Sequence, residues 1–297
     1  MNRQQANREI LTRLSVFLQG SAELGRADVE MLAETYRLPR ETAALTMLSA
    51  CLGLDTEQAG DRMLEEEYLI PGFRLLEPSV YMQDAYRMQI RFPETQCGEW
   101  TFGERAVEAY EVFVRDDLLL TADGREIPCI GTFAERFVYP AVMQNGREWM
   151  TLAPVEIETM RRPVQAACGD VLTFGLGMGY YAFHASCKPE VHSLTIVERD
   201  PELIRMFSRI ILPQFPDREK INIVQMDAYD YLEKCFSEKH FDSVFCDFWH
   251  DAGDGAEQYL RLKTYEKRYE QTFLYWAEGL IRQQLRLEAG GNVAVLD

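Results

Sequence analysis

The feature that most restricts the possible folds is a regular alternation of short apolar segments with helix-like segments in the second half of the chain. Apolar segments rich in β-branched residues stand at 171–174, 193–198, 221–225, 242–247 and 291–297. Helical spacing follows each of the first four, and the longest helical stretch is expected from about 256 to 287. Strands that are apolar along their whole length are typical of parallel sheets covered by helices on both faces. Residues 154–297 are therefore expected to form an α/β fold with a doubly wound, Rossmann-like parallel sheet.

The first half of the chain has a different character. Residues 1–70 carry apolar positions at intervals of three and four, which predicts a helical region. Residues 71–153 hold short runs of aromatic and β-branched residues between turn signals, for example "YRMQIRF" at 86–92, and this predicts a small β-rich region. Asn145-Gly146 lies between two such runs and predicts a β-hairpin. With the α/β region, this makes three expected regions.

The composition excludes several classes of function. The chain has 297 residues and a net charge of −17, which disfavours nucleic-acid partners because polyanions are repelled. No apolar stretch approaches the roughly 20 residues needed to cross a bilayer, and the N-terminus has no signal-peptide core, so we expect a cytoplasmic protein without a membrane partner. The seven cysteines form no C-x-x-C pair and the four histidines no i, i+4 pair, so neither disulfides nor a metal site is expected.

A glycine-rich turn follows the first strand of the α/β region. The stretch "VLTFGLGMGYYAFHAS" (171–186) places Gly175, Gly177 and Gly179 between an apolar strand and a helix start. Glycine lets the backbone approach a ligand closely, and free N–H groups at a helix start attract polar or anionic groups. Ligands of open parallel sheets bind beyond the carboxyl ends of the strands. The turn therefore predicts a nucleotide-type site.

Acidic residues stand at or just beyond the ends of the next three strands. Glu198 ends the second strand, and an acid at this place can accept both ribose hydroxyls of a nucleoside. Asp227 follows the third strand, and Asp247 ends the fourth. Each acid taken singly is explained better as a helix cap or a solvated loop residue than as part of a site. Together with the glycine turn they mark one edge of the sheet as the candidate site.

The spacing of the glycines favours one class of nucleotide ligand. Dinucleotide-binding folds carry G-x-G-x-x-G, but the sixth position here is Tyr180. The spacing G-x-G-x-G suits a nucleoside with a non-phosphate tail. At this point the sequence resembles the class I S-adenosylmethionine (SAM)-dependent methyltransferases, in particular their spermidine-synthase-like branch. The resemblance extends over about residues 135–297.

Short motifs carry this resemblance. "TIVERD" matches the ribose-binding strand end with Glu198, and "MDAYDYL" matches the loop in which Asp227, beside Ala228, would meet the adenine. "FDSVFCD" matches the fourth-strand motif, whose Asp247 would lie between cofactor and acceptor. Upstream, "MQNGREWM" and "EIETM" look like the hairpin and helix that precede the glycine motif in polyamine synthases.

The resemblance implies SAM as the cofactor and in-line transfer of its methyl group to an acceptor, most simply a small molecule and otherwise a protein. Asp247 would orient an amine or hydroxyl group of the acceptor, and His250 or Asp251 would take its proton. Trp149 and Met150 would close over the methionine end of the donor.

Two departures from the family patterns keep other functions open. Methyltransferases usually carry an acid where this chain has Thr173, and polyamine synthases carry an Asp where it has Met178. An aminopropyltransferase that uses decarboxylated SAM and a non-catalytic nucleotide-binding scaffold therefore remain alternatives. No antiparallel strands follow the fifth strand, so the N-terminal half or a second copy of the chain, in a homodimer, is expected to cover the sheet edge.

Overall fold

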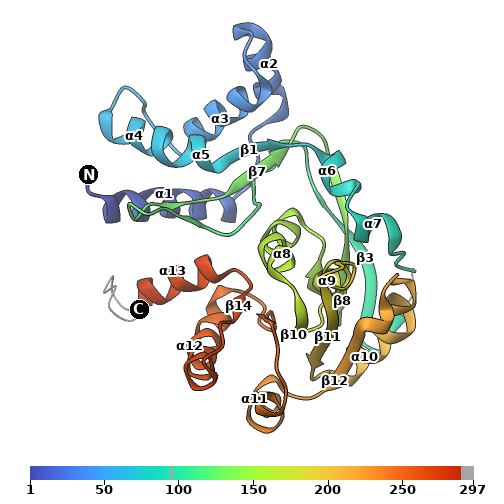
Figure 1. Cartoon of the computed structure of the whole chain (residues 1–297). Coiled ribbons are helices and arrows are strands. Elements are labelled where there is room, and N and C mark those ends of the chain that lie inside the picture. The colour runs from blue at the N-terminus through green and yellow to red at the C-terminus, as the bar shows by residue number, and fades with distance from the viewer. Residues whose placement is uncertain (94–95, 289–297) are drawn as a thin grey trace. The chain divides into compact units, whose positions relative to one another are not determined.

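Figure 1 shows the computed structural model of the chain, which describes residues 1–93 and 96–288. The chain forms two compact units. Unit 1 combines Met1–Val80 with Arg105–Val138, and unit 2 combines Tyr81–Glu104 with the chain from Tyr139 onward. The expected region 71–153 is thus divided between the two units. The strand expected at 291–297 lies outside the described residues.

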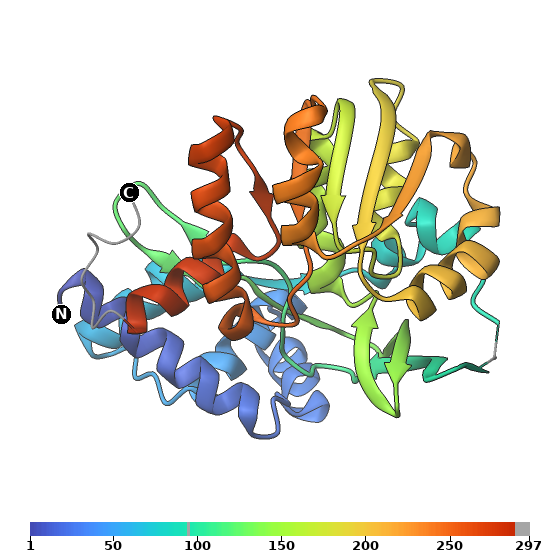
Figure 2. The same cartoon turned by 90° about the horizontal axis from the view of Figure 1, so that it is seen from below.

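Unit 2 is built on a five-stranded sheet in which every neighbouring pair of strands is parallel. The strand order is β12 (Ile221–Gln225), β11 (Val191–Glu198), β10 (Gly169–Phe174), β13 (Ser243–Cys246) and β14 (Leu274–Tyr275). Figure 2 shows the strands from β10 to β12, coloured lime to amber, side by side. The chain runs outward from β10 to β12 and then crosses back to β13, so the strand order reverses between β10 and β13. The predicted α/β class with a doubly wound parallel sheet is confirmed.

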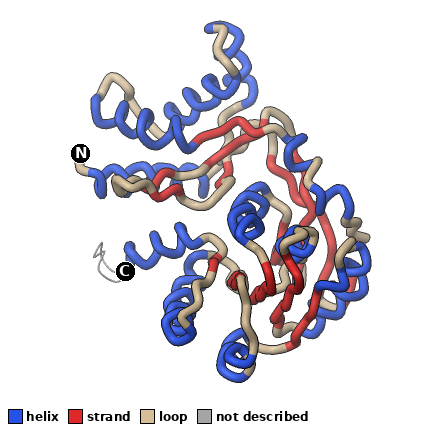
Figure 3. The backbone as a smooth tube through the Cα atoms, viewed as in Figure 1, coloured by secondary structure: helices blue, strands red, loops and turns tan. Residues whose placement is uncertain are grey.

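Helices cover both faces of this sheet (Figure 3). Because successive strand residues point to opposite faces, Val171 and Leu172 belong to two different hydrophobic cores. The core around Val171 includes side chains of α8 (Pro154–Ala166), α9 (Tyr180–Ser186) and α10 (Pro201–Met206). The core around Leu172 includes side chains of α11 (Ala228–Lys234), α12 (Ala252–Tyr269) and α13 (Glu278–Glu288). The sheet is therefore fixed from both sides, and its carboxyl edge stays open for a site.

The prediction of one long helix over 256–287 is wrong. Helix α12 ends at Tyr269, and the next residue, Glu270, has a left-handed φ of +51°. Strand β14 then pairs with β13, and the buried side chains of Phe273 and Tyr275 join the core around α12. Strand β14, at the edge of the sheet, is thus only two residues long. It lies inside a stretch whose apolar spacing resembles that of a helix.

The prediction of a strand over 86–92 is also wrong, because this segment begins with helix α7 (Ala85–Gln89). Asp84 is the N-cap of α7, and its carboxylate accepts hydrogen bonds from the backbone N–H groups of Tyr86 and Arg87. Such a cap satisfies donors that a helix start otherwise leaves unpaired. The cap outweighs the strand-like composition of the residues that follow it.

The hairpin predicted at Asn145-Gly146 is confirmed. It joins the antiparallel strands β8 (Phe137–Gln144) and β9 (Arg147–Thr151). Asn145 and Gly146 have φ values of +52° and +76°, the left-handed conformations that a two-residue turn of this kind requires. These strands are part of a four-stranded sheet with the order β2 (Gln96–Cys97), β3 (Trp100–Val107), β8 and β9.

Unit 1 has its own hydrophobic core, formed by helices and short strands. Its helices are α1 (Arg3–Gln19), α2 (Arg26–Tyr36), α3 (Arg40–Cys51), α4 (Ala59–Leu64), the π-helix Glu65–Leu69 and α5 (Ile70–Gly72), and α6 (Pro78–Met82) follows them. One sheet has the order β1 (Phe73–Leu76), β7 (Ile130–Phe133) and β4 (Phe113–Val114), and β5 (Leu119–Leu120) pairs with β6 (Glu126–Ile127). Over residues 1–93 and 96–288, no helix is both long and apolar enough to cross a membrane.

Candidate functional site

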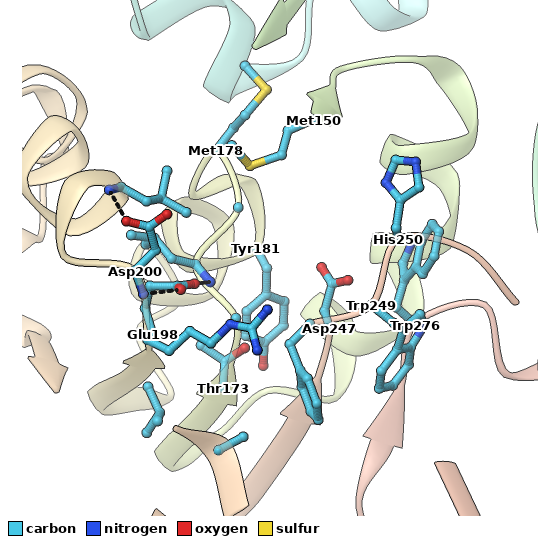
Figure 4. A pocket seen from close by; sticks show the side chains of 18 of the residues that line it. Met150, Thr173, Met178, Tyr181, Glu198, Asp200, Asp247, Trp249, His250 and Trp276 are labelled. Atoms are coloured by element: carbon cyan, nitrogen blue, oxygen red, sulfur yellow. Dashed lines mark hydrogen bonds between the residues drawn. The ribbon is translucent and has the colours of Figure 1, made fainter. Parts of the chain in front are cut away.

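A cavity of about 800 Å³ lies in unit 2 at the carboxyl ends of the parallel strands (Figure 4). It brings together ten of the eleven residues that the sequence analysis assigned to the site: Trp149, Met150, Gly175, Gly177, Gly179, Glu198, Asp227, Ala228, Asp247 and His250. The eleventh, Asp251, is not part of the lining. Small-molecule sites have volumes of roughly 300–1,000 Å³, so the cavity is large enough for a nucleoside with a tail and for a second small ligand.

The three glycines of the turn are required for different reasons. A Cβ atom on Gly175 would lie 1.8 Å from the Asp247 carbonyl oxygen, and one on Gly179 would lie 2.3 Å from the Phe207 ring. Both positions are therefore filled by the protein itself. A Cβ atom on Gly177 would have Met150 Sδ, at 3.8 Å, as its nearest neighbour. Gly177 is thus the glycine whose missing side chain leaves room in the cavity.

Glu198 holds the glycine turn as well as facing the cavity. Its Oε2 accepts a hydrogen bond from the Leu176 N–H at 3.1 Å, and its Oε1 accepts one from the Asp200 N–H at 2.8 Å (Figure 4). A carboxylate oxygen has two acceptor positions, so each oxygen keeps one for a ligand. Glu198 thus connects the turn to the loop after β11. Its position at a strand end did not predict this connection.

Asp227 is the N-cap of α11, and its Oδ1 accepts hydrogen bonds from the N–H groups of Tyr229 and Asp230. The sequence analysis weighed a cap against a ligand contact, and the structure leaves Oδ2 for the second role.

Two residues of α12 lie next to Tyr229. The Arg261 guanidinium carbon lies 3.4 Å from the centre of the Tyr229 ring, and the Tyr229 hydroxyl group donates to Gln258 Oε1 at 2.5 Å. Gln258 and Arg261 also line the cavity. The sequence analysis missed both residues, although their i, i+3 spacing places them on one face of α12.

Two carboxyl groups face the other side of the cavity. Burial raises the pKa of Asp247 to about 7, and burial, together with the nearby charges of Asp247 and Glu148, raises the pKa of Glu156 to about 8. Glu156 lines the cavity from the first turn of α8. Within the described residues neither Asp247 nor Glu156 forms an ion pair. Glu158, two positions further on, is instead paired with Arg161 at 2.6 Å.

Aromatic side chains surround these carboxyl groups. The rings of Trp149 and His250 are stacked with their centres 5.6 Å apart, and Trp249 and Trp276 lie beside Asp247 in Figure 4. The Tyr181 hydroxyl group is buried and has no hydrogen-bond partner among the described residues. An unpartnered buried hydroxyl is costly unless a ligand or water pairs with it. Aromatic rings thus form the side of the cavity next to the Asp247 carboxyl group.

The two predicted proton acceptors are placed differently. His250 lines the cavity, although its side chain is largely exposed to solvent. Asp251 is the N-cap of α12, and its carboxylate accepts hydrogen bonds from the N–H groups of Gly253 and Asp254. The pattern Asp251-x-x-Asp254 is a capping box, a signal that the sequence analysis overlooked. The structure therefore assigns Asp251 to the helix end and not to the cavity.

No protein-family model matches the chain, and no curated protein matches it. Solved structures that resemble it include a spermidine synthase from Thermotoga maritima, with 21% identity over 38% of this chain and 40% of that chain and a TM-score of 0.29. A protein described as a putative O-methyltransferase, from Klebsiella pneumoniae, has 17% identity over 43% of this chain and 63% of that chain, with a TM-score of 0.30. MnmC2 from Aquifex aeolicus has 16% identity over 64% of this chain and 62% of that chain, with a TM-score of 0.26. The chain thus spans less than two thirds of the length of each of these proteins. The likeness to these three proteins concerns the fold alone.

Proposed function

We propose that unit 2 is a SAM-dependent methyltransferase whose acceptor is a small molecule. The alternative acceptor is a protein side chain. The observation that carries this proposal is the open space at Gly177, in a cavity that Glu198, Asp227 and Asp247 also line. A glycine that no neighbouring protein atom requires, at the reversal of a parallel sheet, is the feature expected where a ligand passes close to the backbone.

The donor would lie along the glycine turn. Glu198 has a free acceptor position on each oxygen for the two ribose hydroxyls, and Asp227 Oδ2 is left for the adenine amino group beside Ala228. Thr173 and Met178 also line the cavity, and both are neutral. Neither would repel the carboxylate at the methionine end of SAM.

When bound, SAM supplies a methyl group on a sulfonium, which passes to a lone pair of the acceptor while the electrons of the broken C–S bond remain on sulfur. The protein's part is to align the acceptor and exclude water, which can supply much of the acceleration of such a displacement. Asp247 would orient the acceptor and take its proton, since a base with a pKa of about 7 suits neutral pH. His250 is the second candidate for the proton.

The acceptor side favours an amine over a carboxylic acid. Glu156 and Asp247 place two carboxyl groups there, and no cation among the described residues pairs with either. An ammonium group would favour ionisation of these carboxyl groups, would be attracted to the charge and could pass its proton to Asp247 before it reacts, whereas a carboxylate ligand would oppose their ionisation and be repelled by it. A screen for methyl transfer to pooled amines, alcohols and carboxylic acids is expected to give product with the amines. Product with the carboxylic acids alone would contradict this assignment.

A second candidate is aminopropyl transfer from decarboxylated SAM, and Glu156 is the observation that favours it. Polyamine synthases carry an acid where this chain has Met178, and Glu156 supplies an acid to the same cavity from α8. If Glu156 faced the methionine end of the donor, it would repel the carboxylate of SAM whenever it is ionised. Two like charges about 4 Å apart cost on the order of 4 kcal/mol near a surface.

Parallel titration with SAM and decarboxylated SAM tests the choice between these two functions. We expect SAM to bind at least as tightly as decarboxylated SAM, because no acid lies in the glycine turn. We also expect the ratio of the two dissociation constants to stay unchanged in the Glu156→Gln variant. A clear preference of the wild type for decarboxylated SAM, relieved by Glu156→Gln, would replace methyl transfer with aminopropyl transfer.

The Glu198→Ala variant is expected to bind SAM about tenfold to a hundredfold more weakly than the wild type. Charge-assisted hydrogen bonds are worth roughly 1.5–3 kcal/mol, and the variant loses those to ribose together with the support of Leu176. Glu202→Ala is the matched control, because Glu202 is a nearby acid that does not line the cavity. Calorimetric titration measures both; unchanged affinity in folded Glu198→Ala would remove the ribose assignment.

A further inference from the structure

Residues 84–91, which we call the strap, pack on the glycine turn although they precede it by about ninety positions. Helix α7 of the strap contacts α9. Tyr86 is fully buried, and its ring meets the Phe183 ring edge-on with the centres 5.3 Å apart. The strap is thus fixed to the helix that begins directly after the turn.

Two hydrogen bonds connect the strap to the turn itself. The Tyr86 hydroxyl group donates to the backbone carbonyl oxygen of Met178. The Tyr180 hydroxyl group donates to Asp84 Oδ2 at 2.9 Å. Met178 and Tyr180 stand on either side of Gly179, and both line the cavity. The strap therefore contacts the turn on each side of its last glycine.

Asp84 combines several contacts in one carboxylate. Besides capping α7 and accepting from Tyr180, it lies 3.2 Å from His184 Nε2. Burial opposes ionisation of Asp84, but the neighbouring His184 imidazole and the hydrogen bonds from the Tyr180 hydroxyl group and the Arg87 N–H outweigh it and keep the pKa of Asp84 below its ordinary value. The carboxylate is therefore charged at neutral pH and holds Tyr180 with a charge-assisted hydrogen bond.

The far end of the strap is held as well. Gln214 ends a short 3-10 helix that follows α10, and its side chain accepts from the Arg91 N–H at 2.9 Å and donates to the Arg91 carbonyl oxygen at 3.0 Å. Gln89 Nε2 donates to the Gln214 carbonyl oxygen at 2.7 Å. With both ends anchored, movement of the strap on the turn is restricted.

We propose that the strap is a positioning element of the donor site, in which Tyr86 and Asp84 hold the Met178–Tyr180 part of the glycine turn in the conformation that binds the donor. This inference rests on the proposed function for the identity of the donor. A turn that is already in its binding conformation does not have to be ordered by the ligand, and binding is tighter by the free energy that is saved. Tyr86 and Asp84 would thus act through the turn without touching the donor.

The Tyr86→Phe variant tests the inference because it removes one hydroxyl group and keeps the buried ring. We expect its dissociation constant for SAM to rise about three- to tenfold, the range expected for one hydrogen bond. Tyr81→Phe is the matched control: Tyr81 is also buried in unit 2, but its hydroxyl group donates to Glu158, which does not line the cavity. Calorimetric titration and thermal melting are measured on both variants.

A structural role alone predicts a different result. It would lower Tm in both variants and leave their SAM affinities equal to each other, and that outcome would overturn the inference. Amide hydrogen exchange of residues 175–180 without ligand is the second measurement. We expect faster exchange in Tyr86→Phe and unchanged exchange in Tyr81→Phe. If the wild type bound no SAM, the proposed function would fail, and unchanged exchange in Tyr86→Phe would separately show that the strap does not hold the turn.

Discussion

The Gly177→Val variant is expected to bind SAM more than about a thousandfold more weakly than the wild type, a loss of over about 4 kcal/mol. The Cβ position of Gly177 is open in the protein, since its nearest atom is Met150 Sδ at 3.8 Å. A valine side chain would therefore fill space that the donor requires, and its Cβ atom would displace no protein atom. Calorimetric titration of the purified variant with SAM measures the loss.

A control for backbone strain is needed, because Gly177 has a φ of +53°. A β-branched residue in this conformation costs on the order of 1–3 kcal/mol of stability wherever it stands. Gly53 has a φ of +67°, and no protein atom lies within 4 Å of its Cβ position. Gly53→Val should therefore lower Tm by a similar amount and leave SAM affinity unchanged. SAM binding by folded Gly177→Val at wild-type affinity would mean that the donor does not pass this glycine.

The second large effect concerns stability at alkaline pH, where Glu156→Gln is expected to be more stable than the wild type. In the folded chain Glu156 faces Asp247 and Glu148, and burial together with these charges raises its pKa from 4.5 to about 8. Each pKa unit corresponds to about 1.4 kcal/mol, so the full shift sets an upper limit of about 5 kcal/mol. Water entering the cavity reduces this figure, and we expect about 2 kcal/mol at pH 9.

The direction of the pH dependence follows from proton linkage. Between about pH 4.5 and pH 8 the folded chain binds more protons at Glu156 than the unfolded chain, so this contribution to stability is complete below that range and is lost as pH rises through it. Glutamine does not titrate. The Tm of the variant should therefore equal that of the wild type near pH 5 and exceed it by about 4–8 °C near pH 9.

Glu158→Gln is the control on the same helix. Glu158 is paired with Arg161 and accepts from Tyr81, so its replacement should give no gain at any pH. Thermal melting of the three proteins from pH 5 to pH 9 makes the comparison. Parallel curves for the wild type and Glu156→Gln would show that folding does not raise the pKa of Glu156.

Much of the fold of unit 2 could be predicted from the sequence because its signals are local. The apolar strands, the glycine turn and the Asn145-Gly146 hairpin each depend on residues that are close in sequence. The failures occurred where a short or weak signal was decisive. Strand β14 is two residues long, and α7 depends on the single cap of Asp84.

The site was predicted less completely, because its roles depend on contacts between distant segments. The glycine motif could be recognised, but only the neighbouring Asp247 carbonyl and Phe207 ring show that Gly175 and Gly179 are packing positions. Glu156 acquires its properties from burial beside Asp247, 91 positions away. Asp251 is the opposite case, since its capping box was present in the sequence and pointed to the helix end.

Calorimetric titration of the wild type with SAM and with NAD in parallel tests the central claim most directly, namely that the cavity binds an adenosyl donor without a pyrophosphate. The glycine spacing, the space at Gly177 and the free acceptor positions of Glu198 predict one SAM bound per chain with micromolar affinity and no detectable binding of NAD. Binding of NAD together with failure to bind SAM would contradict the account.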